Sequence, residues 1–289
     1  MQPLNKKTVF CLMARNCAEK LRENIPVIQA LRRCFAASEV LAVENGSTDG
    51  TRELLEAWKA EEDGIELLTP APEIQAIPDR IERLAACRSC YMEVLRKKQA
   101  DYALFIDADV TLVPFDPAEV LAQAPEDFAM LGADGRYYLS LLGRKIPMTY
   151  FDLYAYLPKD SSREGLSLTE QQSCERQLRR QLRRTAYLPC DSAFGGMALY
   201  RFAALQDAAY CTEVNPAGTD KIPYLCENIP FNRSVRQRGG LYIARSMRLY
   251  YEPLSFRQLL WLFMSRLIGT ERLYRLHRRV RGQKGERRA

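Results

Sequence analysis

The sequence is poor in histidine. Among its 289 residues there is one, His277, in a terminal stretch dense in arginine. Ser-His-Asp hydrolysis and most catalytic zinc sites need an imidazole at the reacting atoms. We expect His277 to be a solvated tail residue, which excludes both classes unless the tail folds back onto the body.

Long hydrophobic runs are also missing. The most apolar segment, residues 256–269, is too short to span a bilayer. Only seven uncharged residues separate Lys7 from Arg15, which is too few for a signal peptide and suits a first strand. Nine cysteines show no regular spacing, and the C-x-x-C of Cys87 and Cys90 has no second pair, so packing is favoured over zinc. A reducing, cytoplasmic compartment fits best.

Positive charge is concentrated in one part of the chain. The net charge is +6, but residues 254–289 alone carry +8, so the rest carries −2. This placement argues against nucleic-acid binding by the body. A hydrophobic content of 47% suffices for one large core. We therefore expect a single domain over residues 1–253 and a basic, amphipathic helical tail over residues 254–289.

Short apolar segments alternate with helical patterns in the first half. The predicted strands are residues 8–14, 39–44, 65–68 and 102–106, and the predicted helices are residues 17–37, 51–60 and 79–98. Pro26 lies inside the first helical pattern and could kink it or mark its start. Such alternation predicts an α/β fold with a mostly parallel sheet flanked by helices.

In the second half, strand and helix patterns alternate less regularly. Strands are predicted at residues 128–133, 148–156 and 241–251, and a polar, basic covering segment at residues 161–184. Ligands of mostly parallel sheets bind beyond the carboxyl ends of the strands. In the first half those ends carry Ala14, Arg15, Glu44, Asp49 and Asp107.

Two aspartates end the strand at residues 102–106, in the motif FIDADV. Asp107 and Asp109 would repel each other unless a cation or hydrogen-bond donors lay between them. A divalent ion such as Mg²⁺ or Mn²⁺ prefers a few carboxylate oxygens together with substrate phosphates. The alternative is that Asp107 caps the next turn and Asp109 is solvated, and the tripeptide alone does not separate these interpretations.

The polar turn ENGSTDGT offers further ligand groups. Glu44 and Asp49 could accept hydrogen bonds from a nucleobase or ribose. The alternative is an ordinary turn with Ser47, Thr48 or Asp49 as helix cap.

Arginines on the helix at residues 79–98 could bind phosphate. The planar guanidinium matches phosphate geometry, and Arg88 is the best candidate for a diphosphate, ahead of Arg80 and Arg83. A solvated helix face is the alternative.

In this order and spacing, the ENGSTDGT turn, the R-x-x-x-C-R-x-C helix and the FIDADV strand resemble GT-A-type glycosyltransferases. The later segments DSAFGGMALYR and CENIPFNRSVRQRGGLYI resemble the acceptor half of bacterial and viral members, which are distantly akin to fungal capsule-associated mannosyltransferases. The resemblance covers residues 8–251.

This resemblance implies a nucleoside-diphosphate sugar donor and a Mn²⁺ or Mg²⁺ ion between the diphosphate, Asp107 and Asp109. Asp109 would be the principal ligand, and Asp107 would lie nearer the ribose. Relatives often carry Cys-Glu-His where this chain has Cys226, Glu227 and Asn228. Because Asn is a poorer metal ligand than His, a third protein ligand is in doubt here.

An inverting transferase needs a carboxylate base for the acceptor hydroxyl. Glu227 is the first candidate and Asp191 the second, although Glu227 could instead pair with Arg233 or Arg236. Gly195 and Gly196 would let the backbone approach a sugar closely, or would serve a tight strand entry.

The predicted function is therefore metal-dependent transfer of a hexose, such as mannose, to a surface glycan or lipid-linked acceptor in polysaccharide biosynthesis. One alternative is a nucleotidyltransferase, but residues 14–17 lack the Gly-rich, Lys-containing loop it would need. Another is a catalytically silent nucleotide-sugar or glycan-binding protein.

The basic tail could contact a membrane. Residues 256–269 could lie in an anionic membrane surface on its cytoplasmic side, burying Trp261 and Phe263. Alternatively, this segment packs on the domain.

Overall fold

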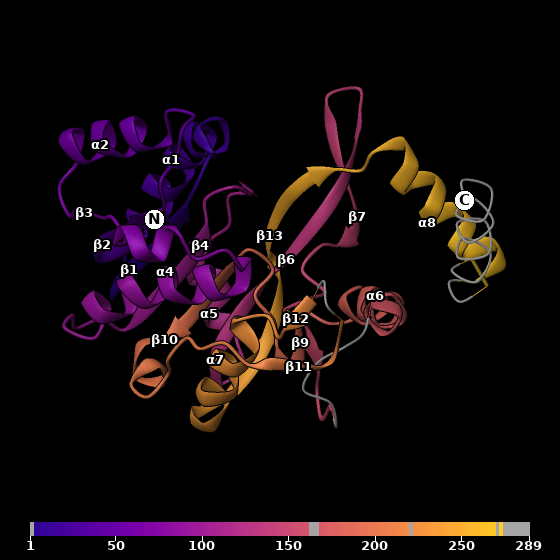
Figure 1. Ribbon diagram of the computed structural model, residues 1–289. Helices are drawn as coiled ribbons and strands as arrows, with labels where there is room; N and C mark the ends of the chain where they lie inside the picture. Colours follow the sequence, from indigo (N-terminus) through magenta and orange to yellow (C-terminus); the bar gives the residue numbers. More distant parts are fainter. Residues whose placement is uncertain (1–2, 162–167, 220–221, 270–271, 274–289) are drawn as a thin grey trace.

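The structure is a computed structural model, and it describes residues 3–161, 168–219, 222–269 and 272–273. A mixed sheet crosses the molecule in the order β3-β2-β1-β4-β10-β6-β13-β9-β8 (Figure 1). Its first four strands are all parallel: β1 (Leu4–Ala14), β2 (Phe35–Glu44), β3 (Ile65–Leu68) and β4 (Tyr102–Asp107).

The second half of the chain completes the sheet with both strand directions. Its strands are β5 (Thr111–Leu112), β6 (Phe128–Leu141), β7 (Arg144–Tyr150), β8 (Leu157–Pro158), β9 (Tyr187–Ser192), β10 (Met197–Arg201) and β13 (Gly240–Pro253). Strand β10 runs antiparallel to both β4 and β6, whereas β13 runs parallel to β6. A separate hairpin joins β11 (Val214–Thr219) to β12 (Ile222–Tyr224).

Helices cover both faces of the sheet. On one face lie α1 (Ala18–Arg32), α2 (Thr51–Glu61) and α5 (Pro117–Gln123); on the other lie α4 (Arg80–Leu95), α6 (Leu168–Leu182) and α7 (Asn228–Val235). The helix α3 (Pro72–Gln75) precedes α4, and α8 (Phe256–Ile268) follows β13. The two faces bury separate apolar clusters, one around Trp58 and the other around Tyr91. The prediction of an α/β fold with a mostly parallel central sheet flanked by helices is confirmed.

The first helix was predicted too long. It ends at Arg32 rather than residue 37, because Phe35 already belongs to β2 and packs edge-on against Phe10, with ring centroids 6.3 Å apart. Pro26 lies inside the helix and does not mark its start.

The strand predicted at residues 148–156 was wrong in position. Strand β7 spans Arg144–Tyr150 and forms a hairpin with β6. The hairpin turns at Leu142 and Gly143, both with positive φ, which is the geometry of a two-residue primed turn. Residues 151–156 then leave the sheet.

The C-terminal helix α8 begins with a capping box formed by Ser255 and Gln258. Figure 1 shows α8 beyond the end of β13, on the opposite side of the molecule from α1 and α2. Of the predicted basic tail, residues 270–271 and 274–289, including His277, lie outside the described residues. Among the helices of the described part of the chain, none is long and apolar enough to cross a membrane.

Candidate active site

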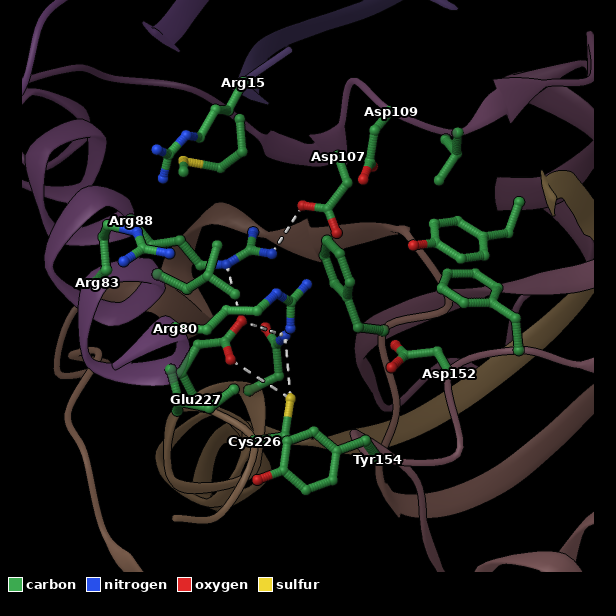
Figure 2. Close-up of a pocket in the computed structure, with 18 of the residues that line it drawn as sticks. Arg15, Arg80, Arg83, Arg88, Asp107, Asp109, Asp152, Tyr154, Cys226 and Glu227 are labelled. Atoms are coloured by element: carbon green, nitrogen blue, oxygen red, sulfur yellow. Dashed lines mark hydrogen bonds and ion pairs between the residues drawn. The ribbon is translucent and has the colours of Figure 1, made fainter. Parts of the chain in front are cut away.

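A pocket of about 380 Å³ lies where β1 and β4 end (Figure 2). Strand pairing places Met13 of β1 opposite Asp107 of β4, so both chain segments leave the sheet at the same edge. The charged residues that line the pocket are Arg15, Arg80, Arg83, Arg88, Asp107, Asp109, Asp152 and Glu227. Four cationic and four anionic side chains therefore share one small volume.

Backbone contacts place the aspartates of the DAD motif. The Asp107 N–H donates to the Gly196 carbonyl at 3.0 Å, and the Ala108 N–H donates to the Met13 carbonyl at 2.8 Å. The side-chain amide of buried Asn24 holds the turn that follows Asp109, because it donates a hydrogen bond to the Val110 carbonyl at 2.6 Å. The turn therefore keeps both carboxylates of the motif at the pocket.

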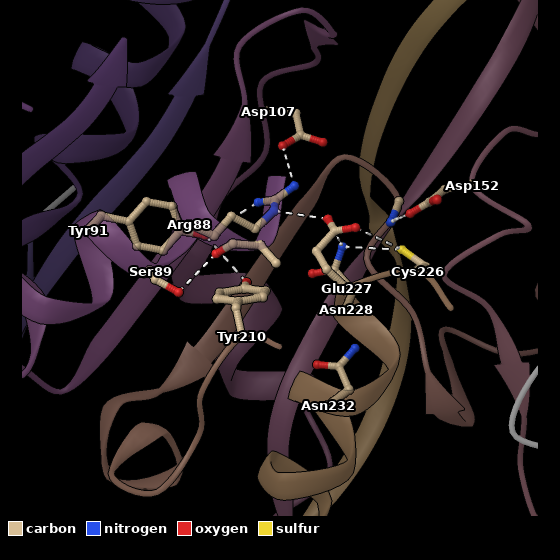
Figure 3. Close-up of polar contacts among 12 residues, drawn as sticks. Arg88, Ser89, Tyr91, Asp107, Asp152, Tyr210, Cys226, Glu227, Asn228 and Asn232 are labelled. Atoms are coloured by element: carbon tan, nitrogen blue, oxygen red, sulfur yellow. Dashed lines mark hydrogen bonds and ion pairs between the residues drawn. The ribbon is translucent and has the colours of Figure 1, made fainter. Parts of the chain in front are cut away.

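Arg88 joins the two halves of the site (Figure 3). Its side chain is 2% exposed, its Nη2 lies 2.7 Å from Asp107 Oδ1, and its Nε lies 3.1 Å from Glu227 Oε1. Its Nη1 donates to the Tyr91 hydroxyl, and its guanidinium lies 4.7 Å from the Phe194 ring centroid. Arg88 of α4 therefore links two carboxylates from different parts of the chain: Asp107 at the end of β4 and Glu227 directly before α7.

Burial raises the pKa of Asp107 to about 7, although Arg88 opposes the shift and the charges of Asp109 and Glu227 add to it. The positive charge of Arg88 is therefore not enough to offset the burial of Asp107 and the nearby negative charges, and the anionic form of Asp107 is disfavoured. A divalent cation would relieve this repulsion, and carboxylate oxygens are the donors that Mg²⁺ and Mn²⁺ prefer. The residues present thus fit such an ion.

Protein ligands alone would not complete a metal site here. Within the residues that the structure describes, no three His, Cys, Asp or Glu side chains are grouped as metal ligands. An ion held by Asp107 and Asp109 would complete its coordination with diphosphate oxygens and water.

Ala14 and Arg15 line the pocket, but the carboxylates of the ENGSTDGT turn do not. Glu44 is buried and accepts a hydrogen bond from the Ser47 N–H at 2.6 Å. Asp49 accepts from the Ala18 N–H at 3.0 Å and from the Thr51 hydroxyl at 2.6 Å. The turn contributes Asn45 to the lining instead.

Gly195 and Gly196 contact residues of the site through their backbone atoms. Both have positive φ, and a Cβ at Gly195 would lie 2.2 Å from the Ala133 carbonyl oxygen. The Gly195 N–H donates to Asp152 Oδ2 at 2.8 Å. They are not among the residues that line the pocket, so the observed geometry is that of a tight strand entry.

Asp191 lies apart from this pocket. Its Oδ2 is 2.8 Å from an Arg236 Nη1, and its Oδ1 is 3.5 Å from Lys159 Nζ. Arg236, considered from the sequence as a partner of Glu227, thus pairs with Asp191, and Arg233 pairs with Glu213.

The sequence did not reveal Asp152. It lines the pocket, and burial raises its pKa to about 6 against the opposing hydrogen bond from the Gly195 N–H. Aromatic rings also line the pocket: Tyr137, Phe151, Tyr154, Phe194 and Tyr251. The available signal is the aromatic-rich segment around residues 150–156, whose pattern predicts a strand.

No family model matches this sequence, and no curated protein sequence matches it. The fold does match solved structures. A mannosyltransferase, PcManGT from Pyrobaculum calidifontis, in complex with GDP-Man and Mn²⁺, is 12% identical with a TM-score of 0.51, over 86% of this chain and 57% of that chain. GalNAc-T7 with UDP, GalNAc and Mn²⁺ is 13% identical with a TM-score of 0.52, over 87% of this chain and 44% of that chain.

These matches confirm the GT-A fold. At this level of identity the likeness is one of fold alone. The chain spans about half the length of each of these two proteins. The more specific resemblance to capsule-associated mannosyltransferases stays a prediction.

Proposed function

We propose that this protein is a metal-dependent glycosyltransferase that uses a nucleoside-diphosphate sugar. One observation carries the proposal: paired aspartates at the end of β4 share a pocket with several arginines, on a GT-A fold. Carboxylates suit a divalent ion and guanidinium groups suit phosphates, so the pocket has ligands for both parts of a metal-bound diphosphate.

Asp109 and Asp107 would hold Mn²⁺ or Mg²⁺. When bound, the ion would supply electrostatic stabilisation to the charge that develops on the departing diphosphate. Asp107 is fixed by Arg88 through Oδ1, which leaves Oδ2 for the ion or the ribose. Within the described residues, Asp109 makes no ion pair with Arg88, and it would be the principal ligand.

Two other arginines suit the diphosphate better than Arg88 does. Arg88 is buried and already engages Asp107 and Glu227, so its role here is to position these two carboxylates. Arg15 and Arg80 are exposed at the pocket lining and can reach a bound ligand. We assign the phosphate contacts to Arg15 and Arg80.

Glu227 and Asp152 are the candidate bases for the acceptor hydroxyl. Glu227 is 2% exposed, and its Oε1 accepts from both Arg88 and Asn228. A base works best when its pKa lies near the working pH, and the raised pKa of Asp152 meets this condition. Glu227 stays the predicted base, and Asp152 is the alternative candidate.

The donor sugar is proposed to be a hexose, with mannose the first to test. One fold neighbour was solved with GDP-Man and another with UDP and GalNAc. The acceptor is proposed to be a surface glycan or a lipid-linked saccharide.

Peripheral contact with the cytoplasmic face of an anionic membrane is proposed for α8. Phe256, Leu260 and Phe263 are 79%, 50% and 58% exposed. Their spacing puts them on one helix face, which could enter the lipid headgroup region. The charge of +8 over residues 254–289 would attract anionic lipids.

The proposed function is tested by ligand-dependent thermal stability and turnover. We expect GDP- or UDP-sugars to raise the melting temperature only with Mn²⁺ or Mg²⁺ present, because a ligand of the native state stabilises it. Asp109→Asn should remove this effect, whereas Asp63→Asn, at an exposed position outside the pocket lining, should not.

The same screen separates the alternatives. Metal-dependent stabilisation together with release of nucleoside diphosphate supports an enzyme. Stabilisation without any turnover over a broad acceptor panel would favour the silent binding protein. No stabilisation by any nucleotide sugar would refute the proposal.

A further inference from the structure

A second cavity, of about 690 Å³, adjoins the candidate active site. We call it the side cavity. It lies between β7 with the segment that follows it and the helices α6 and α8, and it shares three residues with the first pocket: Tyr137, Phe151 and Tyr154. A ligand in the side cavity would therefore lie next to the candidate active site, and these three aromatic residues would contact both.

Helix α8 presents different faces to the side cavity and to solvent. Its lining residues are Arg257, Gln258, Trp261, Leu262 and Ser265. The exposed Phe256, Leu260 and Phe263 lie on the opposite side at helical spacing. The inward side thus combines polar groups with Trp261 and Leu262, a mixture that suits recognition of a polar ligand.

A buried carboxylate lines the side cavity. Glu175 of α6 is 6% exposed, and its Oε1 makes no hydrogen bond within the described part of the chain. Arg179, one helical turn along α6, places its Nε 3.8 Å from that oxygen. A buried acceptor without a donor is costly, and a ligand hydroxyl in the cavity would offset the cost.

The other lining groups complete a chemistry suited to sugars. Guanidinium groups of Arg176, Arg179 and Arg257 can donate to hydroxyl oxygens, while Trp261 and Tyr137 offer aromatic faces for the C–H face of a pyranose. Arg176 also donates to the Ser265 carbonyl at 3.2 Å and so ties α6 to α8. Three arginines against one glutamate favour a ligand that carries negative charge.

We propose that the side cavity is the acceptor subsite, and that it takes a saccharide bearing a phosphate or carboxylate group. This inference rests on the proposed function, whose acceptor it specifies. In the transfer step, the acceptor hydroxyl oxygen bonds to the anomeric carbon of the donor. The bond from that carbon to the diphosphate oxygen breaks with its electron pair, and the hydroxyl proton passes to Asp152 or Glu227.

Tryptophan fluorescence tests binding without any donor. The chain has two tryptophans. Trp58 belongs to α2 and is 2% exposed in the core, so Trp261 is the one beside the cavity. The probes are mannose 1-phosphate, glucose 1-phosphate, methyl mannoside and inorganic phosphate. We expect a saturable emission change with a sugar phosphate, absent in Trp261→Phe, and at least tenfold weaker binding of methyl mannoside.

Two outcomes of the titration would overturn the proposal. An equal response to inorganic phosphate and the sugar phosphates would mean an anion site only and would overturn the saccharide assignment. Absence of any response that depends on Trp261 would overturn the subsite.

Glu175→Gln tests the role in transfer. We expect it to raise the KM for the sugar-phosphate acceptor at least tenfold while the donor still raises the melting temperature as in the unchanged protein. Arg180→Gln, at an exposed position on the same helix outside the cavity lining, is the control and should leave transfer unchanged.

The two proposals fail in different ways. If the donor stabilises Glu175→Gln and transfer to the acceptor is normal, the acceptor subsite is wrong and the glycosyltransferase proposal stands. If no nucleotide sugar stabilises the unchanged protein, the proposed function itself fails, and the fluorescence response of Trp261 then reports only a saccharide-binding site.

Discussion

Two adjoining cavities of this protein have very different linings. The candidate active site holds four arginines and four carboxylates, brought together by the ends of β1 and β4 and by α4 and the start of α7. The side cavity holds three arginines and one glutamate among aromatic and aliphatic side chains from β7, α6 and α8. Dense, opposed charge suits a metal-bound diphosphate, whereas fewer and mostly positive charges among rings suit a sugar that carries a negative group.

The two linings also differ in how their buried charged side chains are bonded. In the first, Arg88 bonds both Asp107 and Glu227 and is almost wholly buried. In the second, Glu175 keeps one oxygen without a hydrogen bond. Changes in the candidate active site should therefore affect both folding and chemistry, and changes in the side cavity should chiefly affect binding of the second substrate.

The largest effect is expected for Asp109→Asn. Loss of a metal ligand should lower metal-dependent transfer by on the order of 10³-fold, since charge on the leaving diphosphate would no longer be balanced. The response of Trp261 to sugar phosphates should stay unchanged. Kinetic assays and fluorescence titration check the pair, and turnover equal to that of the unchanged protein would refute the metal role.

Arg88→Met should strongly destabilise the fold. It removes the partner of buried Glu227 and of partly buried Asp107, and breaking a buried ion pair costs about 3–5 kcal/mol. Denaturant unfolding measures the loss. Arg22→Met, at an exposed position on α1, should change the free energy of unfolding by under about 0.5 kcal/mol. Equal effects of the two changes would contradict the central role of Arg88.

Asp152→Asn should stabilise the protein in a pH-dependent way. Burial raises the pKa of Asp152 to about 6, well above the ordinary value of an aspartate, so the native state loses stability relative to the variant as the pH rises from about 4 to 6. The variant should gain about 1–3 kcal/mol above pH 6 and nothing below pH 4. Unfolding curves at several pH values test this, and a constant difference would contradict the raised pKa.

The smallest effect is expected on the outer face of α8. Phe256→Ser with Phe263→Ser should weaken binding to phosphatidylserine vesicles about tenfold, since less apolar surface enters the lipid. Neither acceptor binding nor melting temperature should change. Vesicle sedimentation measures the effect, and unaltered binding would leave no role for this face at a membrane.

Most of the parallel half of the fold was predictable from sequence. Strand β4 begins at Tyr102 as its apolar run predicts, and α2 begins at Thr51. The end of α1 and the position of β7 were not. The first depends on the packing of Phe35 with Phe10, and the second on Leu142 adopting positive φ, which its residue type does not signal.

The candidate site was predictable where motifs are local. Asp107 and Asp109 follow a buried strand, and the structure brings them together with Arg15 and Glu227. The ligand role proposed for Glu44 depended on where its side chain points, and the Ser47 N–H holds it within its own turn. Position along a strand does not determine such contacts.

Other site residues depend on long-range packing. Asp152 lies in the segment predicted as an aromatic-rich strand, and Glu175 lies in the segment predicted as a polar cover. Neither prediction marks a site residue, and both residues become visible only once β6, β7, α6 and α8 are assembled. Apart from Arg179, which pairs with Glu175, most residues that share a cavity with them are distant in sequence, so local spacing could not have indicated them.

Anomalous scattering from crystals grown with Mn²⁺ and a GDP- or UDP-sugar tests the central claim most directly. The account predicts one manganese peak within bonding distance of an Asp109 oxygen and of both phosphates of the donor, with Asp107 beside it. A donor bound with its manganese away from both aspartates would contradict the account.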